Sequence, residues 1–364
     1  MPNENNALTA IDLFSGGGGL SLGLKKAGFN VVAAVEINSK ITKTYKANHK
    51  KTVVIERDIR EVTGKEIMEL VQCDKIILVA GCPPCQGFSS LTSKFDREDS
   101  RNDLILEMAR IVEELNPVMV MMENVPGLAN RGKYLLNQFV SRLEAKGYTT
   151  NCDVFQLADY EIPQMRRRLV LLAGRGFKIE FPKKTNCFKP NEKNKLKPRI
   201  TLDRVIKDME KPITFGKAMK NGGPKKFNWH VVGEMDEINK NRLRKLRAGN
   251  DRKFLPDEMR PICHSKGNKG FTNVYGRLRW KQVSPTITSG FTTLSMGRFG
   301  HPSQLRTISV REAALIQTFP INYKIDTTHI TTAREIVGNA FPPKFGQKIA
   351  KRCINAYFKY YKDV

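Results

Sequence analysis

Long apolar runs are absent from this sequence. No stretch reaches the 18 or more apolar residues that a membrane-spanning helix needs. The opening residues, MPNENNALTA, also lack the basic and apolar segments of an export signal. We therefore expect a protein that stays in the cytoplasm and binds no membrane.

The sequence also lacks the even, closely spaced cysteines of a disulfide-stapled domain. Its cysteines are seven, an odd number, spread along 364 residues: Cys73, Cys82, Cys85, Cys152, Cys187, Cys263 and Cys353. We expect reduced thiols, as in a bacterial cytoplasm. A structural zinc site is not expected either, because it needs four ligands and no second C-x-x-C and no H-x-x-x-H accompanies CPPC.

Negative charge is scarce, and the excess of positive charge is unevenly placed. The formal net charge is +26, and residues 183–305 alone hold 28 Lys and Arg against 10 Asp and Glu. A basic third of the chain beside a nearly neutral remainder favours contact with a polyanion such as nucleic acid. The alternative is that the lysines serve only solubility.

Short runs rich in valine, isoleucine and leucine alternate with helical stretches between residues 8 and 174. The predicted strands are TAIDLF, NVVAAVE, TVVIERD, KIILVA and VMVMME. Helices with a 3.6-residue period separate them, for example at 103–115 and 133–147. Apolar strands separated by helices predict an α/β domain with a mostly parallel, doubly wound sheet that is covered on both faces.

The pattern changes near residue 182. From 183 to 305 the periodicity is weak, and glycine, asparagine and lysine are frequent. Regular helices return with SVREAALIQTF and end with the amphipathic FGQKIAKRCINAYFKYY. We therefore divide the chain into 1–182, 183–305 and 306–364, a regular domain interrupted by a smaller irregular one, with the last helix rejoining the first part.

Residues able to bind ligands follow five consecutive predicted strands. In an open parallel sheet, ligands bind at the carboxyl ends of the strands. Those ends carry Phe14 to Gly19, Glu36, Asp58, the segment 81–90 and Glu123-Asn124.

The glycine run at 16–19 and the next two acids indicate a nucleoside-like ligand. The run fits neither G-x-G-x-x-G nor a phosphate-binding P-loop, since no G-K-[ST] follows it. Glu36 stands where a carboxylate can accept from both hydroxyls of a ribose, and Asp58 could accept from an adenine amino group. Each acid alone is more simply a solvated strand end, but together behind the glycines they favour an adenosyl ligand.

The segment GCPPCQGFSS places two cysteines three apart after an apolar strand. A redox pair has this spacing. A thioredoxin-like domain is small, however, and needs neither an adenosyl site nor a basic lobe. We therefore favour one nucleophilic cysteine on a loop stiffened by prolines.

Glu123 and the segment QMRRR complete the candidate site. Glu123 follows a buried strand, where desolvation can raise the pKa of a carboxyl group enough to let it donate a proton. Arg166 and Arg168 are expected on one side of an extended segment, aligned with Gln164, and could hold Glu123, a phosphate or a carbonyl oxygen. The alternative for QMRRR is a surface charge run.

Taken together and in order, these segments resemble the DNA (cytosine-5)-methyltransferases of the standalone bacterial type. The resemblance spans nearly the whole chain through DLFSGGGGL, VEIN, RDI, GCPPCQGFS, ENVPGL, QMRRRLVLLA, SPTIT, SVREAALIQTFP and VGNAFPP. It implies a Rossmann-like class I methyltransferase domain formed by 1–182 and 306–364. Residues 183–305 would be the target-recognition domain.

The resemblance also implies roles for single residues. S-adenosylmethionine would be the methyl donor, with no metal. Its site would comprise Phe14 on the adenine, Gly16, Gly18, Glu36 at the ribose, Asp58 with Ile59 at the adenine edge, and Asn339, which would help to order the site. The catalytic set would comprise Cys85 as nucleophile, Glu123 at cytosine N3, and Arg166 and Arg168 nearby. Cys82 stands where the family usually has another residue, and we interpret it as a bystander.

The expected partner is double-stranded DNA, bound by a monomer associated with the nucleoid. Where a restriction endonuclease accompanies the enzyme, it would act separately. The alternative substrate is tRNA, which one branch with this fold methylates. The closest approach to the Cys-Phe-Thr signature of that branch is Cys187-Phe188-Lys189, which lacks the threonine. The long basic segment favours duplex DNA.

Overall fold

The computed structural model describes residues 8–84, 103–191, 193, 195–261 and 273–362. The chain forms two compact units. The first comprises Met1–Tyr160, Arg167–Lys184 and Phe341–Val364, and the second comprises Glu161–Arg166 and Thr185–Ala340. No helix within the described ranges has the length and apolar character needed to cross a membrane.

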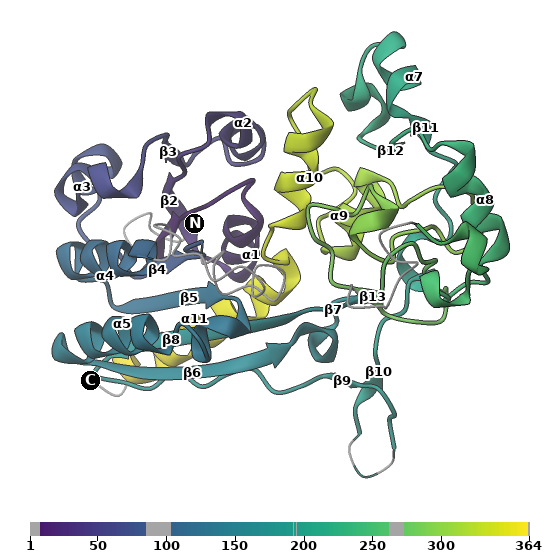
Figure 1. The fold of residues 1–364 in the computed structure, drawn as a ribbon. Helices are drawn as coiled ribbons and strands as arrows, with labels where there is room; N and C mark the ends of the chain where they lie inside the picture. Colours follow the sequence, from purple (N-terminus) through teal and green to yellow (C-terminus); the bar gives the residue numbers. More distant parts are fainter. Residues whose placement is uncertain (1–7, 85–102, 192, 194, 262–272, 363–364) are drawn as a thin grey trace. The chain divides into compact units, whose positions relative to one another are not determined.

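A seven-stranded sheet forms the centre of the first unit, in the order β3-β2-β1-β4-β5-β8-β6 (Figure 1). Its strands are β1 (Thr9–Leu13), β2 (Asn30–Val35), β3 (Val53–Ile55), β4 (Leu78–Gly81), β5 (Met119–Asn124), β6 (Tyr148–Gln156) and β8 (Arg167–Arg175). The first five strands pair in parallel, and β8 runs antiparallel to both β5 and β6. The prediction of a doubly wound, mostly parallel α/β sheet is confirmed.

Helices cover both faces of this sheet. They are α1 (Gly19–Ala27), α2 (Ser39–Asn48), α3 (Gly64–Val71), α4 (Leu104–Leu115), α5 (Lys133–Ala145) and α11 (Pro343–Lys362), with short 3₁₀ turns η2 (Ile59–Glu61), η5 (Pro126–Ala129) and η6 (Leu157–Tyr160). Ile11 and Leu13 of β1 point into the apolar cluster that includes α4 and α5. Asp12 lies between them in β1 and bonds to Ser21 of α1 on the opposite face.

The C-terminal helix α11 packs against α1, the first helix of the chain. Its buried residues Phe345, Ile349 and Cys353 recur every four residues and form one apolar face. The two backbones approach closely at Gly23, where a Cβ atom would lie 2.7 Å from the Pro343 carbonyl oxygen and 2.9 Å from the Gln347 nitrogen. Only glycine fits at this crossing.

Replacing Gly23 with alanine should therefore destabilise the first unit. We expect the free energy of unfolding to fall by about 1–3 kcal/mol, since the added methyl group meets backbone that cannot rotate away. Gly233→Ala is the matched control, because a Cβ at Gly233 would meet no atom within 4 Å. Urea denaturation of both variants checks this, and equal stability of the two would contradict the close crossing.

The second unit is irregular and is held by short elements. Its strands are two-residue pairs: β7 (Gln164–Met165) with β13 (Ser284–Pro285), β9 (Asn186–Cys187) with β10 (Lys197–Pro198), and β11 (Ile213–Thr214) with β12 (Val231–Val232). Its helices are α6 (Asp203–Ile206), α7 (Phe215–Lys220), α8 (Glu237–Lys245), α9 (Val310–Ile316) and α10 (Ile330–Gly338), with 3₁₀ turns η7 (Pro224–Phe227), η8 (Arg252–Phe254), η9 (Asp257–Met259) and η11 (Leu294–Met296).

Helix α9 is fixed within the second unit by buried charged groups. Ser309 and Glu312 form a reciprocal capping box at its start. Glu312 also accepts two bonds from Arg306, at 2.7 and 2.8 Å. Arg311 is 1% exposed and donates to the carbonyl oxygens of Asn228 and Tyr323. These contacts tie α9 to distant loops of its own unit.

The longer segment of the second unit begins at Thr185, close to residue 183 in the sequence-based division. That segment ends at Ala340, so residues 306–340 lie in the second unit. Compactness does not test which segment serves catalysis and which serves target recognition. The functional boundaries 1–182, 183–305 and 306–364 stay predictions.

Candidate active site

The loop between β1 and α1 has a left-handed backbone at three positions. Phe14, Gly16 and Gly18 have φ angles of 58°, 53° and 88°. Glycine adopts such angles without a steric penalty. A Cβ at Gly16 would meet no atom within 4 Å, so open space lies beside this backbone. A ligand can therefore approach the main chain closely here.

Glu36, directly after β2, is joined to this loop. Its Oε2 accepts a hydrogen bond from the Gly16 nitrogen at 2.9 Å, and its Oε1 accepts from the Asn38 nitrogen at 3.0 Å. Two backbone donors fix the plane of the carboxylate, which keeps further lone pairs for other donors. The structure thus brings two predicted cofactor residues, Gly16 and Glu36, into direct contact.

Asp58 lies after β3, at the start of η2. Its Oδ1 accepts from the backbone nitrogen of Arg60 at 3.0 Å, and its Oδ2 lies 2.6 Å from the Arg60 guanidinium. Hydrogen bonding to Arg60 holds the pKa of Asp58 below its usual value. Ile59 beside it is buried. The carboxylate therefore stays ionised and able to accept further hydrogen bonds.

A buried polar network lies next to the loop between β1 and α1, which we call the glycine loop. Asp12 is fully buried, and its Oδ2 accepts from the Ser21 nitrogen at 3.0 Å and from Ser21 Oγ at 2.6 Å. Ser21 Oγ also lies 2.6 Å from Tyr45 Oη. These contacts anchor the first turn of α1 to β1 and α2, and so fix the loop between β1 and α1 at its far end.

His49, at the end of α2, holds the loop itself. Its Nε2 lies 3.2 Å from the Gly18 carbonyl oxygen. A carbonyl oxygen only accepts, so Nε2 carries the proton in this contact. The ring also contacts Tyr45, with centroids 4.6 Å apart. Burial lowers the pKa of His49 to about 4, so the ring is neutral at physiological pH.

Asp12 and His49 should give this network opposite dependences on pH. Burial raises the pKa of Asp12 from 3.8 to about 7. Between these values the folded protein holds a proton that the unfolded chain has released, so the free energy of unfolding falls as pH rises. The lowered pKa of His49 acts in the other direction between about 4 and 6.5, where stability rises with pH.

Asp12→Asn should remove the first of these effects. We expect the variant to gain about 2–4 kcal/mol of stability relative to wild type as pH rises from 4 to 7, with no further change above 7. Urea denaturation at pH 4 to 8 measures this difference. His49→Gln is the control and should change the slope in the opposite sense. Parallel curves for wild type and Asp12→Asn would contradict a buried titrating carboxyl group.

The backbone after β4 leads towards the predicted nucleophile. The Cys82 nitrogen donates to the Leu13 carbonyl oxygen at 3.2 Å, and Asn124 Nδ2 donates to the Pro83 carbonyl oxygen at 3.1 Å. Burial and the nearby Glu123 carboxylate raise the pKa of the Cys82 thiol, which therefore stays protonated. Cys85 lies outside the described residues.

Glu123 and Arg168 form a charged contact in the candidate site that is largely shielded from water. Arg168 Nε lies 2.6 Å from Glu123 Oε1, and the two side chains are only 14% and 10% exposed. They lie on neighbouring antiparallel strands, where Glu123 pairs with Val170 and Asn124 with Leu169. A charged pair so shielded from water interacts more strongly than a surface pair. The contact with Glu123 that was predicted for the segment QMRRR is made by Arg168.

Arg166 and Asn339 lie in the second unit. The Arg166 guanidinium donates to the carbonyl oxygens of Ile287 at 2.9 Å and Ala340 at 3.2 Å. Gln164 accepts from the Ile287 nitrogen at 3.1 Å and so holds the same segment. Asn339 ends α10, where its nitrogen bonds to the Glu335 carbonyl oxygen. The predicted roles of Arg166 in catalysis and of Asn339 at the cofactor stay predictions.

A model of the C-5 cytosine-specific DNA methylase family matches residues 8–355. The chain belongs to this family. It is 35% identical over 349 residues to the Type II methylase M.HgiDII of Herpetosiphon aurantiacus, covering 94% of this chain and 93% of the relative. It is 31% identical over 351 residues to the Type II methyltransferase M1.HphI of Haemophilus parahaemolyticus, covering 95% and 86%.

Solved structures agree on the fold of this methylase. The Dnmt2 methyltransferase of S. pombe superposes with a TM-score of 0.64 at 17% identity, covering 98% of this chain and 99% of that one. At such low identity the likeness concerns architecture alone. It matches the α/β, Rossmann-like arrangement of the first unit.

Sequence reasoning missed most of the groups that support the site of this methylase. Ser21 and Tyr45 lie in α1 and α2, and His49 directly follows α2, so their contacts depend on how these helices pack. The one available signal was Asp12, a charged residue inside the apolar run TAIDL. A buried acid in a strand needs hydrogen-bond donors, and it therefore marks a polar network.

Among the described residues, no group of three or more His, Cys, Asp or Glu side chains is arranged to hold a metal ion. The side chains gathered at the carboxyl ends of the strands are carboxylates paired with arginine or with backbone nitrogens. Such groups suit hydrogen-bonding to a polar organic ligand.

Proposed function

We propose that this methylase transfers a methyl group from S-adenosylmethionine to C5 of a cytosine that is flipped out of duplex DNA. Membership of the C-5 cytosine-specific DNA methylase family carries the proposal. The Glu123–Arg168 pair supports it, because it lies at the end of β5, where Asn124 also holds Pro83, two residues before Cys85.

The first unit has residues that fit an adenosyl cofactor. Gly16 has open space beside its backbone, and Glu36 is held in a fixed orientation by two backbone nitrogens. We assign the ribose hydroxyls to Glu36, the adenine face to Phe14, and the adenine edge to Asp58 and Ile59. Gly16 and Gly18 allow the methionine part to lie against the main chain. When bound, S-adenosylmethionine supplies an electrophilic methyl group.

Cys85 supplies the nucleophile in this proposal. Its thiolate adds to cytosine C6, which ends the aromaticity of the ring and makes C5 electron-rich enough to take the methyl group. Loss of the C5 proton then expels the thiolate and restores the ring. Glu123 contacts N3 and stabilises the charge that develops there, while Arg168 fixes the carboxylate in place.

The target base must leave the helix before any of this chemistry. A stacked cytosine cannot reach a side chain within a pocket, and flipping costs a few kcal/mol of unstacking. We assign the basic segment 183–305 to DNA binding, with most of its lysines and arginines neutralising phosphates and a few side chains reading bases. We further propose that the chain works as a monomer on nucleoid DNA, and that any cognate restriction endonuclease acts separately.

Bisulfite sequencing of plasmid DNA from cells that express the protein tests the proposal. We expect cytosines within one short motif to resist conversion, and no such motif in cells that express Cys85→Ser. Purified protein should also transfer tritiated methyl groups to the same plasmid prepared from cells that lack the protein, and not to tRNA. Methyl transfer to tRNA alone would overturn the proposal.

A further inference from the structure

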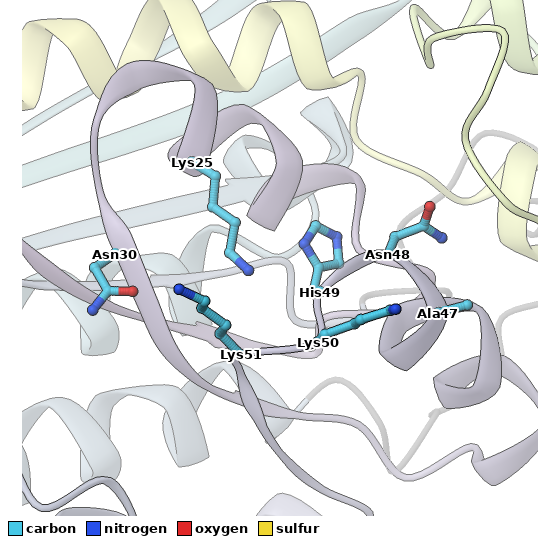
Figure 2. A pocket seen from close by; sticks show the side chains of 7 residues that line it. All are labelled: Lys25, Asn30, Ala47, Asn48, His49, Lys50 and Lys51. Carbon is cyan, nitrogen blue, oxygen red and sulfur yellow. The ribbon is translucent and has the colours of Figure 1, made fainter.

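A pocket of about 420 Å³ lies in the first unit beside the end of α1, the end of α2 and the start of β2. Its polar lining consists of Lys25, Asn30, Asn48, His49, Lys50 and Lys51. Figure 2 shows the tips of Lys25 and Lys51 on the same side of the His49 ring, with Lys50 extending on the other side. The volume is in the range of small-molecule sites.

The charges around this pocket are all of one sign. No aspartate or glutamate lines it. Lys25 is partly buried, and burial lowers the pKa of its ammonium group. The hydrogen bond that it makes is to a neutral group, the Thr52 hydroxyl at 2.9 Å. Within the described ranges, none of the three lysines forms an ion pair.

Asp12 does not neutralise this charge. It lowers the energy of the Lys25 ammonium only from a distance, and its own carboxyl group is fully buried beneath the glycine loop. Two ammonium groups directed into one space repel each other, and an anion between them would replace repulsion with attraction. A partly desolvated lysine without a carboxylate partner is therefore suited to an external anion.

We propose that this pocket binds a phosphate group. Lysine ammonium groups are donors with a full charge and suit phosphate oxygens, and the amide of Asn30 adds a neutral donor beside them. The site would serve a phosphate-bearing molecule, either free or part of a nucleic-acid backbone.

The pocket lies away from Glu36, although its lining residue His49 also contacts the Gly18 carbonyl oxygen of the loop between β1 and α1. Asn30 is the first residue of β2, whereas Glu36 follows the last, so about 20 Å of strand lies between them. The pocket therefore opens at the amino ends of the strands, and the cofactor residues lie at the carboxyl ends. The proposal does not depend on the assigned methyl transfer.

Isothermal titration of the full chain with inorganic phosphate tests the site, with ionic strength held constant by chloride. We expect saturable binding to wild type and a Kd at least about tenfold weaker for Lys51→Ala. Lys51→Arg should keep most of the affinity, which separates loss of charge from loss of fold.

Lys43→Ala is the matched control. Lys43 is an exposed lysine of α2 that does not line the pocket, and its removal changes the net charge equally. We expect its Kd for phosphate to stay within twofold of wild type. Equal weakening in Lys43→Ala and Lys51→Ala, or no saturable binding by wild type, would overturn the proposal, because only general charge attraction would remain.

A second titration identifies the source of the phosphate. Fluorescence anisotropy with a labelled DNA duplex measures affinity at several salt concentrations. Weaker duplex binding by Lys51→Ala, with a salt slope smaller by about one, indicates a backbone phosphate. Unchanged duplex binding together with lost phosphate binding indicates a free phosphate-bearing molecule. Either result supports the site.

Discussion

Cys85→Ser should abolish methyl transfer, with kcat reduced by at least about 10³-fold. A serine hydroxyl keeps the size of the thiol but is almost never ionised near neutral pH, so it cannot add to cytosine C6 at a useful rate. Tritiated-methyl transfer to the mapped DNA motif measures the loss. DNA affinity should stay within a few-fold of wild type, since the basic residues proposed to bind phosphates are unchanged.

Cys82→Ala is the matched control for this prediction. It removes the other thiol of the segment but keeps the backbone bond from residue 82 to the Leu13 carbonyl oxygen. Burial and Glu123 raise the pKa of Cys82, and a protonated thiol is a poor nucleophile. We therefore expect Cys82→Ala to retain activity. Activity lost in Cys82→Ala and kept in Cys85→Ser would reverse the assignment.

Trapping the covalent adduct gives an independent result. DNA that carries 5-fluorocytosine at the target should form a stable adduct, because fluorine cannot leave C5 as a proton does. Peptide mapping should find the adduct at Cys85 in wild type and in Cys82→Ala. Absence of an adduct on the methylated motif would contradict the nucleophile.

The second large effect concerns the pair of Glu123 and Arg168. Glu123→Gln should reduce kcat by about 10²–10⁴-fold, since the amide cannot hold or deliver the proton that N3 needs as charge develops. It should also destabilise the fold, because Arg168 loses its buried partner at 2.6 Å. Stability and activity must therefore be measured separately.

The double variant Glu123→Gln, Arg168→Met separates the two effects. Removing both charges eliminates the unpaired buried cation, so thermal stability should return towards the wild-type value. Activity should stay as low as in Glu123→Gln alone. Recovery of both stability and activity would show that the pair serves only the fold.

Much of the first unit could be predicted from the sequence, because its strands are apolar and its helices periodic. Glu36 and Asp58 come after β2 and β3, and Glu123 lies at the end of β5, as the predicted strands placed them; their roles stay predictions. The antiparallel direction of β8 had no signal, since strand direction depends on tertiary pairing. Helix α3 has an amphipathic pattern and a Thr63 cap, but it was not identified.

The segment QMRRR shows where a periodic pattern stops being informative. A period of two places alternate residues on one face only within a single strand. Here β7 ends at Met165 and β8 begins at Arg167, so Arg166 lies between two strands. Arg166 bonds to carbonyl oxygens of the second unit, while Arg168 pairs with Glu123 in the first.

The packing of α11 on α1 has a consequence for biosynthesis. The ribosome makes α1 early, but its partner helix begins only at Pro343. The close backbone crossing at Gly23 must therefore wait until residues 28–342 and the start of α11 have been translated. Until then the surface of α1 at Leu20 and Gly23, which lies against Gly346 and Pro343 of α11, lacks its partner, and the nascent chain offers a binding surface to chaperones.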